Sequence, residues 1–262
     1  MREMQDGSEN AAPAADCGNQ ADGARALSPW LTAGTLFGML VLHTVTVFAA
    51  MVAFGVAAGL LEIGGAAGNN WLDAAGGAVC IMLWTPLAVG MLWLLLRLSG
   101  RKFRDYLALR PPGPKDAVKA VLGLAALLGA FEAFYFCLGV SPLTEWQLRV
   151  FGAVKGFWLW LLITATVLAA PLWEEILFRG FLYRGWARGR CPFIGGVIIP
   201  AALWALIHGG QYDWFFLAQI FVFGVYLGAV RRRTGSLWLC AGLHALNNAA
   251  AVFFTLTALA RG

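Results

Sequence analysis

Two adjacent carboxylates and an arginine lie in one of the most apolar stretches of this chain, Pro171-Leu-Trp-Glu-Glu-Ile-Leu-Phe-Arg179. An ionised side chain at the centre of a membrane span costs roughly 2.5–3.5 kcal/mol, so these groups must pair or face water. Glu175 and Arg179 are four residues apart with the carboxylate first, which is the favourable order for an ion pair on a helix. We therefore expect this pair to stabilise the helix and to leave Glu174 free as a buried general base.

Two histidines and an asparagine are placed so that they can meet Glu174. His208 ends an apolar stretch, and it lies about as far from a turn near residue 191 as Glu174 does, roughly 25 Å along each helix. His244 and Asn248 are four residues apart and share one face of the last apolar stretch. Antiparallel packing would therefore bring Glu174, His208, His244 and Asn248 together inside the membrane.

These residue types fit hydrolysis of a peptide bond without a covalent enzyme intermediate. A glutamate and a histidine that share one water make a nucleophile, and a histidine and an asparagine amide can donate hydrogen bonds to a developing oxyanion. The same groups also fit zinc, because one carboxylate and two imidazoles are a common catalytic ligand set. The helical H-E-x-x-H motif is absent, however. We favour a reaction without metal or other cofactor, with a zinc metalloprotease as the rival mechanism.

The order and spacing of these residues resemble the signature motifs of the CPBP intramembrane proteases, a family that includes the Rce1-type CAAX prenyl endopeptidases and the bacterial Abi-type proteins. The resemblance covers about residues 171–248 and includes Gly224-x-x-x-Gly228, which is typical of closely packed helices. Trp204 stands where the family usually has Phe. The three motifs are Glu174-Glu175-x-x-x-Arg179, Trp204-x-x-x-His208 and His244-x-x-x-Asn248.

The resemblance implies a glutamate-type intramembrane endopeptidase. Eukaryotic relatives cut after a prenylated cysteine, whereas the composition of this chain suggests a bacterium, in which the substrate would be another membrane-associated peptide. The implied roles are activation of water by Glu174 and His208, stabilisation of the oxyanion by His244 and Asn248, and support of the site by Glu175, Arg179 and the aromatic wall of Trp204.

The elements that must position these residues are transmembrane helices. The chain is 60% hydrophobic and 13% charged, with a mean hydropathy of +0.71 over 262 residues, and its long uncharged runs favour helices over a barrel. We predict an all-α polytopic bundle over 29–262, with its motif-bearing core at 156–259, after a disordered tail at 1–28. The seven predicted spans, or eight if further short helices are present, are Trp30–Leu61, Ala74–Leu96, Ala117–Val140, Gly156–Arg188, Phe193–His208, Trp214–Val230 and Leu237–Leu259.

The basic residues predict the orientation of the bundle. Nearly all of the 19 Lys and Arg residues fall in the segments that would be cytoplasmic if the N-terminus were cytoplasmic. This asymmetry accounts for the net charge of +5 without nucleic acid as a partner. We expect a multi-pass protein of the bacterial cytoplasmic membrane, whose partners are the lipid bilayer and a membrane-associated peptide or protein.

Two other functions remain open from the residues alone. Intramembrane glutamates and histidines can relay protons in a transporter, although paired discontinuous helices in an inverted repeat, which are typical of transporters, are not found. A catalytically silent immunity or scaffold protein is the other alternative. Glu132, near the middle of the third predicted span, has no partner that the sequence indicates.

Overall fold

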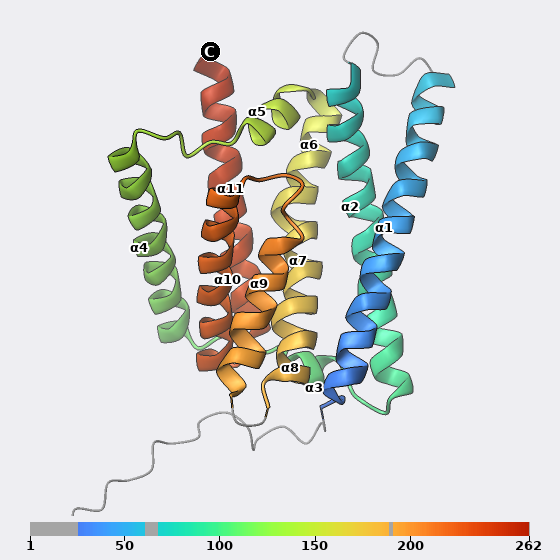
Figure 1. Cartoon of the computed structure of the whole chain (residues 1–262), viewed down its shortest axis with the longest axis vertical. Helices are drawn as coiled ribbons and strands as arrows, with labels where there is room; N and C mark the ends of the chain where they lie inside the picture. Colours follow the sequence, from blue (N-terminus) through green and yellow to red (C-terminus); the bar gives the residue numbers. More distant parts are fainter. Residues whose placement is uncertain (1–25, 61–67, 189–190, 262) are drawn as a thin grey trace, which may run out of the picture.

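The computed structural model describes residues 26–60, 68–188 and 191–261, and almost all of the predicted tail lies outside them. The described residues form helices and their connections, without a strand (Figure 1). Two continuous helices contain three π-helical stretches, at Ala165–Ala169 and Ile176–Leu182 in the first and at Ile194–Ile198 in the second. The α-helices are α1 (Pro29–Leu60), α2 (Gly68–Leu98), α3 (Phe103–Leu107), α4 (Pro114–Leu138), α5 (Glu145–Gly152), α6 (Gly156–Thr164), α7 (Ala170–Glu175), α8 (Tyr183–Trp186), α9 (Ile199–Leu206), α10 (Trp214–Thr234) and α11 (Leu237–Arg261).

Six continuous helices in the described part of the chain are long and apolar enough to cross a membrane. They are α1, α2, α4, the run Gly156–Trp186 from α6 to α8, α10 and α11. The polytopic all-α bundle is therefore confirmed. The fifth predicted span is the shorter apolar helix Ile194–Leu206, which includes α9.

The helices alternate in direction, so the basic segments collect at one end of the bundle. The start of α1, the short helix α3, α8 and the end of α10 lie together at the lower end of Figure 1, whereas α5 and the C-terminus lie at the upper end. Arg231–Arg233 form the last turn of α10 and belong to the lower end. The basic residues therefore lie at the same end as the start of α1, as expected if the N-terminus is cytoplasmic.

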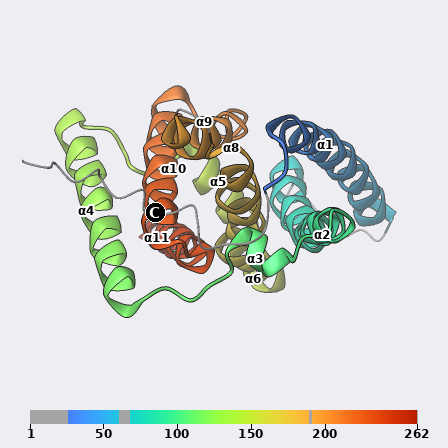
Figure 2. The ribbon, with the colours of Figure 1, turned by 90° about the horizontal axis from the view of Figure 1, so that it is seen from below.

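The central helix of the bundle is the run from α6 to α8, because α2, α9 and α11 all pack against it. Its most buried side chains include Leu177, Phe178 and Phe181, which belong to the main hydrophobic core. By contrast, α4 lies to one side of the bundle next to α10 and α11, as both views show (Figures 1 and 2). Many apolar side chains on α1 and α4 are exposed, as expected for surfaces that face lipid.

The small residues of α10 allow it to approach the central helices closely. A Cβ added at Gly228 would lie 2.7 Å from Val197, and one at Gly224 would lie 3.0–3.1 Å from Ala201, Arg179 and Trp204. Both contacts lie within one chain, so Gly224-x-x-x-Gly228 is a packing face between α10 and the helix that contains α9. The close approach matters for the site because it brings the α10 backbone to Arg179.

Candidate active site

The two adjacent glutamates lie on α7, a six-residue helix between two π-helical stretches. Proline has no N–H to donate, so Pro171 leaves a carbonyl of the preceding turn unpaired. In the first π-helical stretch the N–H of Ala170 bonds to the carbonyl of Ala165. The same spacing would pair residue 171 with the Thr166 carbonyl. Asn248 Nδ2 donates to this carbonyl at 2.9 Å and so supplies the hydrogen bond that Pro171 cannot make.

The predicted ion pair between Glu175 and Arg179 is present and deeply buried. Arg179 Nη1 lies 2.7 Å from Glu175 Oε1, and the two side chains are 2% and 0% exposed. Arg179 Nη2 also donates to the Gly224 carbonyl at 3.2 Å. The guanidinium lies over the indole ring of Trp204, 4.5 Å from the ring centroid. Arg179 therefore joins the central helix to both α9 and α10, through charge, hydrogen bonding and a cation–π contact.

Glu174 has a partner that the sequence analysis did not predict. Trp204 Nε1 donates a hydrogen bond to Glu174 Oε2 at 2.6 Å, so the carboxylate is outside the ion pair but is not free. A phenylalanine has no N–H group and could not make this bond. The tryptophan at this position is thus more than an aromatic wall, because it binds one carboxylate oxygen and leaves the other for a different partner.

His208 is oriented by the same tryptophan residue. Its Nδ1 lies 2.7 Å from the Trp204 carbonyl oxygen. A carbonyl can only accept a hydrogen bond, so Nδ1 carries the proton and the neutral ring has its lone pair on Nε2. His208 can therefore accept a hydrogen bond from water on the side of the ring that faces away from the helix backbone.

His244 contacts Glu175, whereas we expected it to meet Glu174. Its Nδ1 lies 3.0 Å from Glu175 Oε1, the oxygen that also binds Arg179. An ionised carboxylate only accepts hydrogen bonds, so Nδ1 must carry a proton. A second proton on Nε2 would make the ring an imidazolium. His244 can donate a hydrogen bond through Nε2 only in that doubly protonated form.

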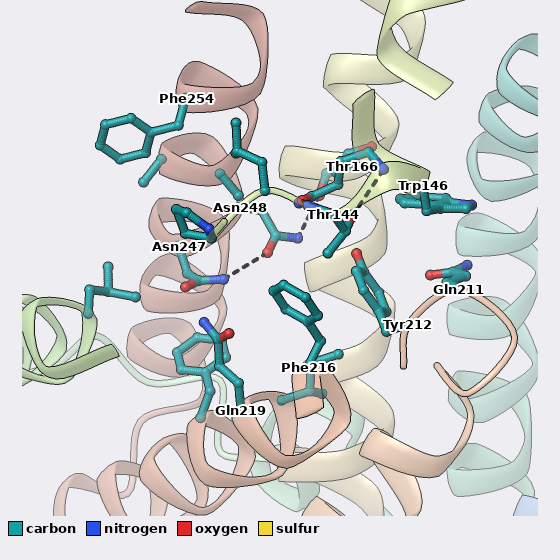
Figure 3. A pocket seen from close by; sticks show the side chains of 18 of the residues that line it. Thr144, Trp146, Thr166, Gln211, Tyr212, Phe216, Gln219, Asn247, Asn248 and Phe254 are labelled. Carbon is teal, nitrogen blue, oxygen red and sulfur yellow. Dashed lines mark hydrogen bonds between the residues drawn. The ribbon is translucent and has the colours of Figure 1, made fainter. Parts of the chain in front are cut away.

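A cavity of about 640 Å³ brings the predicted residues together. Its lining comes from α2, α4, α5, the central helix, α9, α10 and α11, and Figure 3 shows part of it. Glu175 and Arg179 are buried and do not line the cavity. The predicted residues that line the cavity are Glu174, Trp204, His208, His244 and Asn248.

Several polar residues of the cavity were missed by the sequence analysis. Asn247 Nδ2 donates to Asn248 Oδ1 at 3.2 Å and so fixes the orientation of that amide (Figure 3). Tyr212 precedes α10, and its ring centroid lies 6.2 Å from that of His208. Burial, with a smaller contribution from the Glu174 carboxylate, raises the pKa of Tyr212 to about 12, so its hydroxyl remains a donor at neutral pH. Tyr212 lies four residues after His208, a spacing that could have indicated it.

Glu174, His208 and His244 are residue types that bind zinc, but the described residues do not group them as a set of ligands. Within residues 26–60, 68–188 and 191–261 no three His, Cys, Asp or Glu side chains are grouped closely enough to bind a metal. The Nδ1 atoms of both histidines are hydrogen-bonded, which leaves Nε2 of each ring to bind a water or a metal.

Comparison with known proteins identifies a family for the region that contains the site. Residues 156–250 match the family model described as type II CAAX prenyl endopeptidase Rce1-like. This segment includes every predicted site residue, from Glu174 to Asn248. Searches of the curated proteins and of the solved structures found no match.

Proposed function

We propose that this chain belongs to the Rce1-like type II CAAX prenyl endopeptidases, whose family model its residues 156–250 match. We propose further that it hydrolyses a peptide bond of a membrane-associated substrate by means of a water held between Glu174 and His208. The observation that carries this proposal is that both residues line one cavity, with the Trp204 indole bound to one oxygen of Glu174. The second oxygen of Glu174 and Nε2 of His208 are the two acceptors that a single water molecule needs.

In the proposed reaction Glu174 removes a proton from this water as its oxygen attacks the scissile carbonyl. The oxygen–carbon bond forms, the carbonyl becomes an oxyanion, and the proton passes to the leaving amine as the carbon–nitrogen bond breaks. We assign stabilisation of the oxyanion to the Nε2–H of a protonated His244 and to the Asn248 amide. Asn248 Nδ2 has two hydrogens, and the bond to the Thr166 carbonyl uses one of them.

We propose that this reaction needs no metal, because no three potential ligands among the described residues are grouped closely enough to hold one. The rival zinc mechanism predicts that a chelator abolishes cleavage and that added zinc restores it. We expect purified protein to retain its cleavage rate after dialysis against EDTA, with metal content measured on the same sample. Loss of activity that zinc specifically restores would contradict the metal-free mechanism.

A peptide-cleavage screen tests the proposed function. Purified chain in lipid nanodiscs would be incubated with peptides that either contain or lack a lipidated cysteine, and products would be identified by mass spectrometry. We expect cleavage of at least one peptide class by the wild type. If the wild type cleaves nothing, and Glu174→Gln behaves like wild type in cells, the chain is a catalytically silent membrane protein.

We also propose that the N-terminus is cytoplasmic, so that the end of the cavity lined by α5 and the C-terminal end of α11 lies toward the opposite face. The cavity is lined by residues of α5 and by the C-terminal end of α11, which lie at the end of the bundle away from the basic segments (Figure 1). Arg261 is the lining residue nearest to the C-terminus. A substrate that enters by this route approaches from the extracytoplasmic side or from within the bilayer.

Cysteine labelling of whole cells tests this orientation. Cys191, before α9, and Ser141, before α5, are both exposed and lie at opposite ends of the bundle. In a chain with Cys17 and Cys137 replaced by serine, we expect Ser141→Cys to react with a membrane-impermeant maleimide in intact cells. Cys191 should react only after the cells are permeabilised. The reverse pattern would overturn the orientation.

Replacement of the tryptophan by the residue usual in the family tests the indole hydrogen bond. We expect Trp204→Phe to lower kcat/KM about 10- to 100-fold, the range for loss of one hydrogen bond to a charged group. The effect should fall mainly on kcat, because Glu174 loses its orientation. Trp238→Phe, at a half-exposed position on α11, is the matched control and should leave kcat unchanged. Equal kinetics for both variants would remove Trp204 from the mechanism.

A further inference from the structure

Glu132 is a carboxylate on the wall of the cavity for which the proposed reaction gives no role. It lies on α4 and shares a helix face with Leu128, Gly129 and Tyr135, which also line the cavity. A Cβ added at Gly129 would have no neighbour within 4 Å, so there is open space one turn away from the carboxylate. Glu132 itself is exposed. The side chain therefore has both access to the cavity and room beside it for a ligand.

The contact between α4 and α10 shows which residues of α10 lie level with Glu132. The Tyr135 hydroxyl donates to Gln219 Oε1, and the two helices run in opposite directions (Figure 1). A residue three positions before Tyr135 therefore lies level with residues three or four positions after Gln219, which is where Phe223 is found. The Phe223 ring centroid lies 5.8 Å from that of His244 and 6.0 Å from that of Trp204. Glu132 is thus at the depth of the proposed reaction centre, on the wall formed by α4.

The charges that line the cavity favour a cation at this depth. Both carboxylates of the lining, Glu132 and Glu174, lie at the depth of the proposed reaction centre, whereas the buried Glu175 is neutralised by Arg179 and does not line the cavity. Among the described residues Arg261 is the one Lys or Arg side chain in the lining. It lies thirteen residues beyond Asn248 on α11, or roughly 20 Å along the helix. A carboxylate in a span is costly unless it faces water or a partner.

We propose that Glu132 is a specificity-determining residue that binds a lysine or arginine side chain of the substrate close to the scissile bond. This inference rests on the proposed function, since it takes the cavity to be the substrate site. The substrate cation would form a charge-assisted hydrogen bond with the Glu132 carboxylate, and a substrate with a glutamate at that position would be repelled. Tyr135 and Gln219, bonded to each other one turn away, leave Glu132 free to turn toward the ligand.

Positional libraries of quenched-fluorescent decapeptides provide the test. Each library would have lysine, norleucine or glutamate at one fixed position, and the full chain would be held in nanodiscs of zwitterionic phosphatidylcholine so that the lipid does not attract cations. We expect lysine to exceed norleucine in kcat/KM by roughly 10- to 100-fold at one position, the factor of a charge-assisted hydrogen bond. Glu132→Gln should reduce this ratio to about one, and Glu132→Lys should make glutamate the preferred residue.

Glu145→Gln provides the matched control for the loss of one carboxylate. Glu145 begins α5 and does not line the cavity, so its removal should leave the lysine-to-norleucine ratio unchanged. A purely structural role for Glu132 would lower cleavage of all libraries equally and would not make glutamate preferred in Glu132→Lys. A ratio that stays the same in Glu132→Gln would overturn the proposal.

A binding measurement separates failure of this inference from failure of the proposed function. The same lysine, norleucine and glutamate peptides would be titrated against the Glu174→Gln chain by fluorescence anisotropy. If the wild type cleaves no peptide but lysine peptides bind more tightly and lose this advantage in Glu132→Gln/Glu174→Gln, the hydrolysis proposal fails and the cation site stands. If lysine has no advantage in binding or in cleavage, the cation site is wrong.

Discussion

Glu174→Gln is expected to reduce cleavage by about 10³-fold or more, near the upper part of the range for loss of a general base. Glutamine keeps the size of the side chain, and its amide oxygen can still accept the Trp204 hydrogen bond seen at 2.6 Å. It cannot take a proton from water. The loss should therefore appear in kcat, while binding of the peptide and thermal stability remain close to those of the wild type.

Three further measurements make this prediction specific. Glu174→Asp keeps the carboxylate on a shorter stem and should recover part of the activity. Glu145→Gln, which removes an exposed carboxylate outside the cavity, should retain wild-type kinetics. Melting temperatures of all variants, measured in the same nanodiscs, would show whether a loss of activity is a loss of fold. A Glu174→Gln chain that is folded and cleaves at the wild-type rate would remove Glu174 from the reaction.

Arg179→Ala is expected to destabilise the folded chain by about 3–5 kcal/mol, the cost of leaving one charge of a buried pair without its partner. Glu175 is completely buried. Within the described residues, its Oε1 contacts Arg179 and His244. The substitution also removes the hydrogen bond to the Gly224 carbonyl and the contact with the Trp204 ring.

The unfolding free energy of Arg179→Ala can be compared with two other variants in reversible denaturation from mixed micelles. Arg233→Ala removes an exposed arginine at the end of α10 and should change stability by less than about 0.5 kcal/mol. Glu175→Gln combined with Arg179→Met removes both charges, and it should lose less stability than Arg179→Ala alone. If the double variant were the less stable of the two, the unpaired charge would not be the cause of the loss.

The pairing of Glu175 with Arg179 could be predicted from sequence because both residues lie on one helix, where spacing alone decides which side chains meet. The common depth of Glu174 and His208 could be predicted because two antiparallel helices joined by a short turn have a nearly fixed register. The spans and the basic end of the bundle followed from hydropathy and from the positions of Lys and Arg. Each of these inferences depends on distances measured along a helix.

Contacts between helices far apart in sequence could not be predicted in this way. The rotation of α9 about its axis directs the Trp204 indole N–H at Glu174, and the rotation of α11 directs His244 at Glu175 instead. The carbonyl that Pro171 leaves unpaired is bound by Asn248, which lies 82 residues from Thr166. Sequence indicates that such a carbonyl needs a donor, but it does not indicate which helix provides one.

The sequence by itself determined the residue types of the site and their approximate depth in the membrane, because helical rise and span length convert residue numbers into distances. Only the tertiary structure decided which atoms meet, because that depends on the rotation of each helix about its axis and on how closely its neighbours approach. Glu132 illustrates the difference. Its charge marked it in the sequence, and the packing of α4 against α10 places it on the cavity wall at the depth of Trp204 and His244.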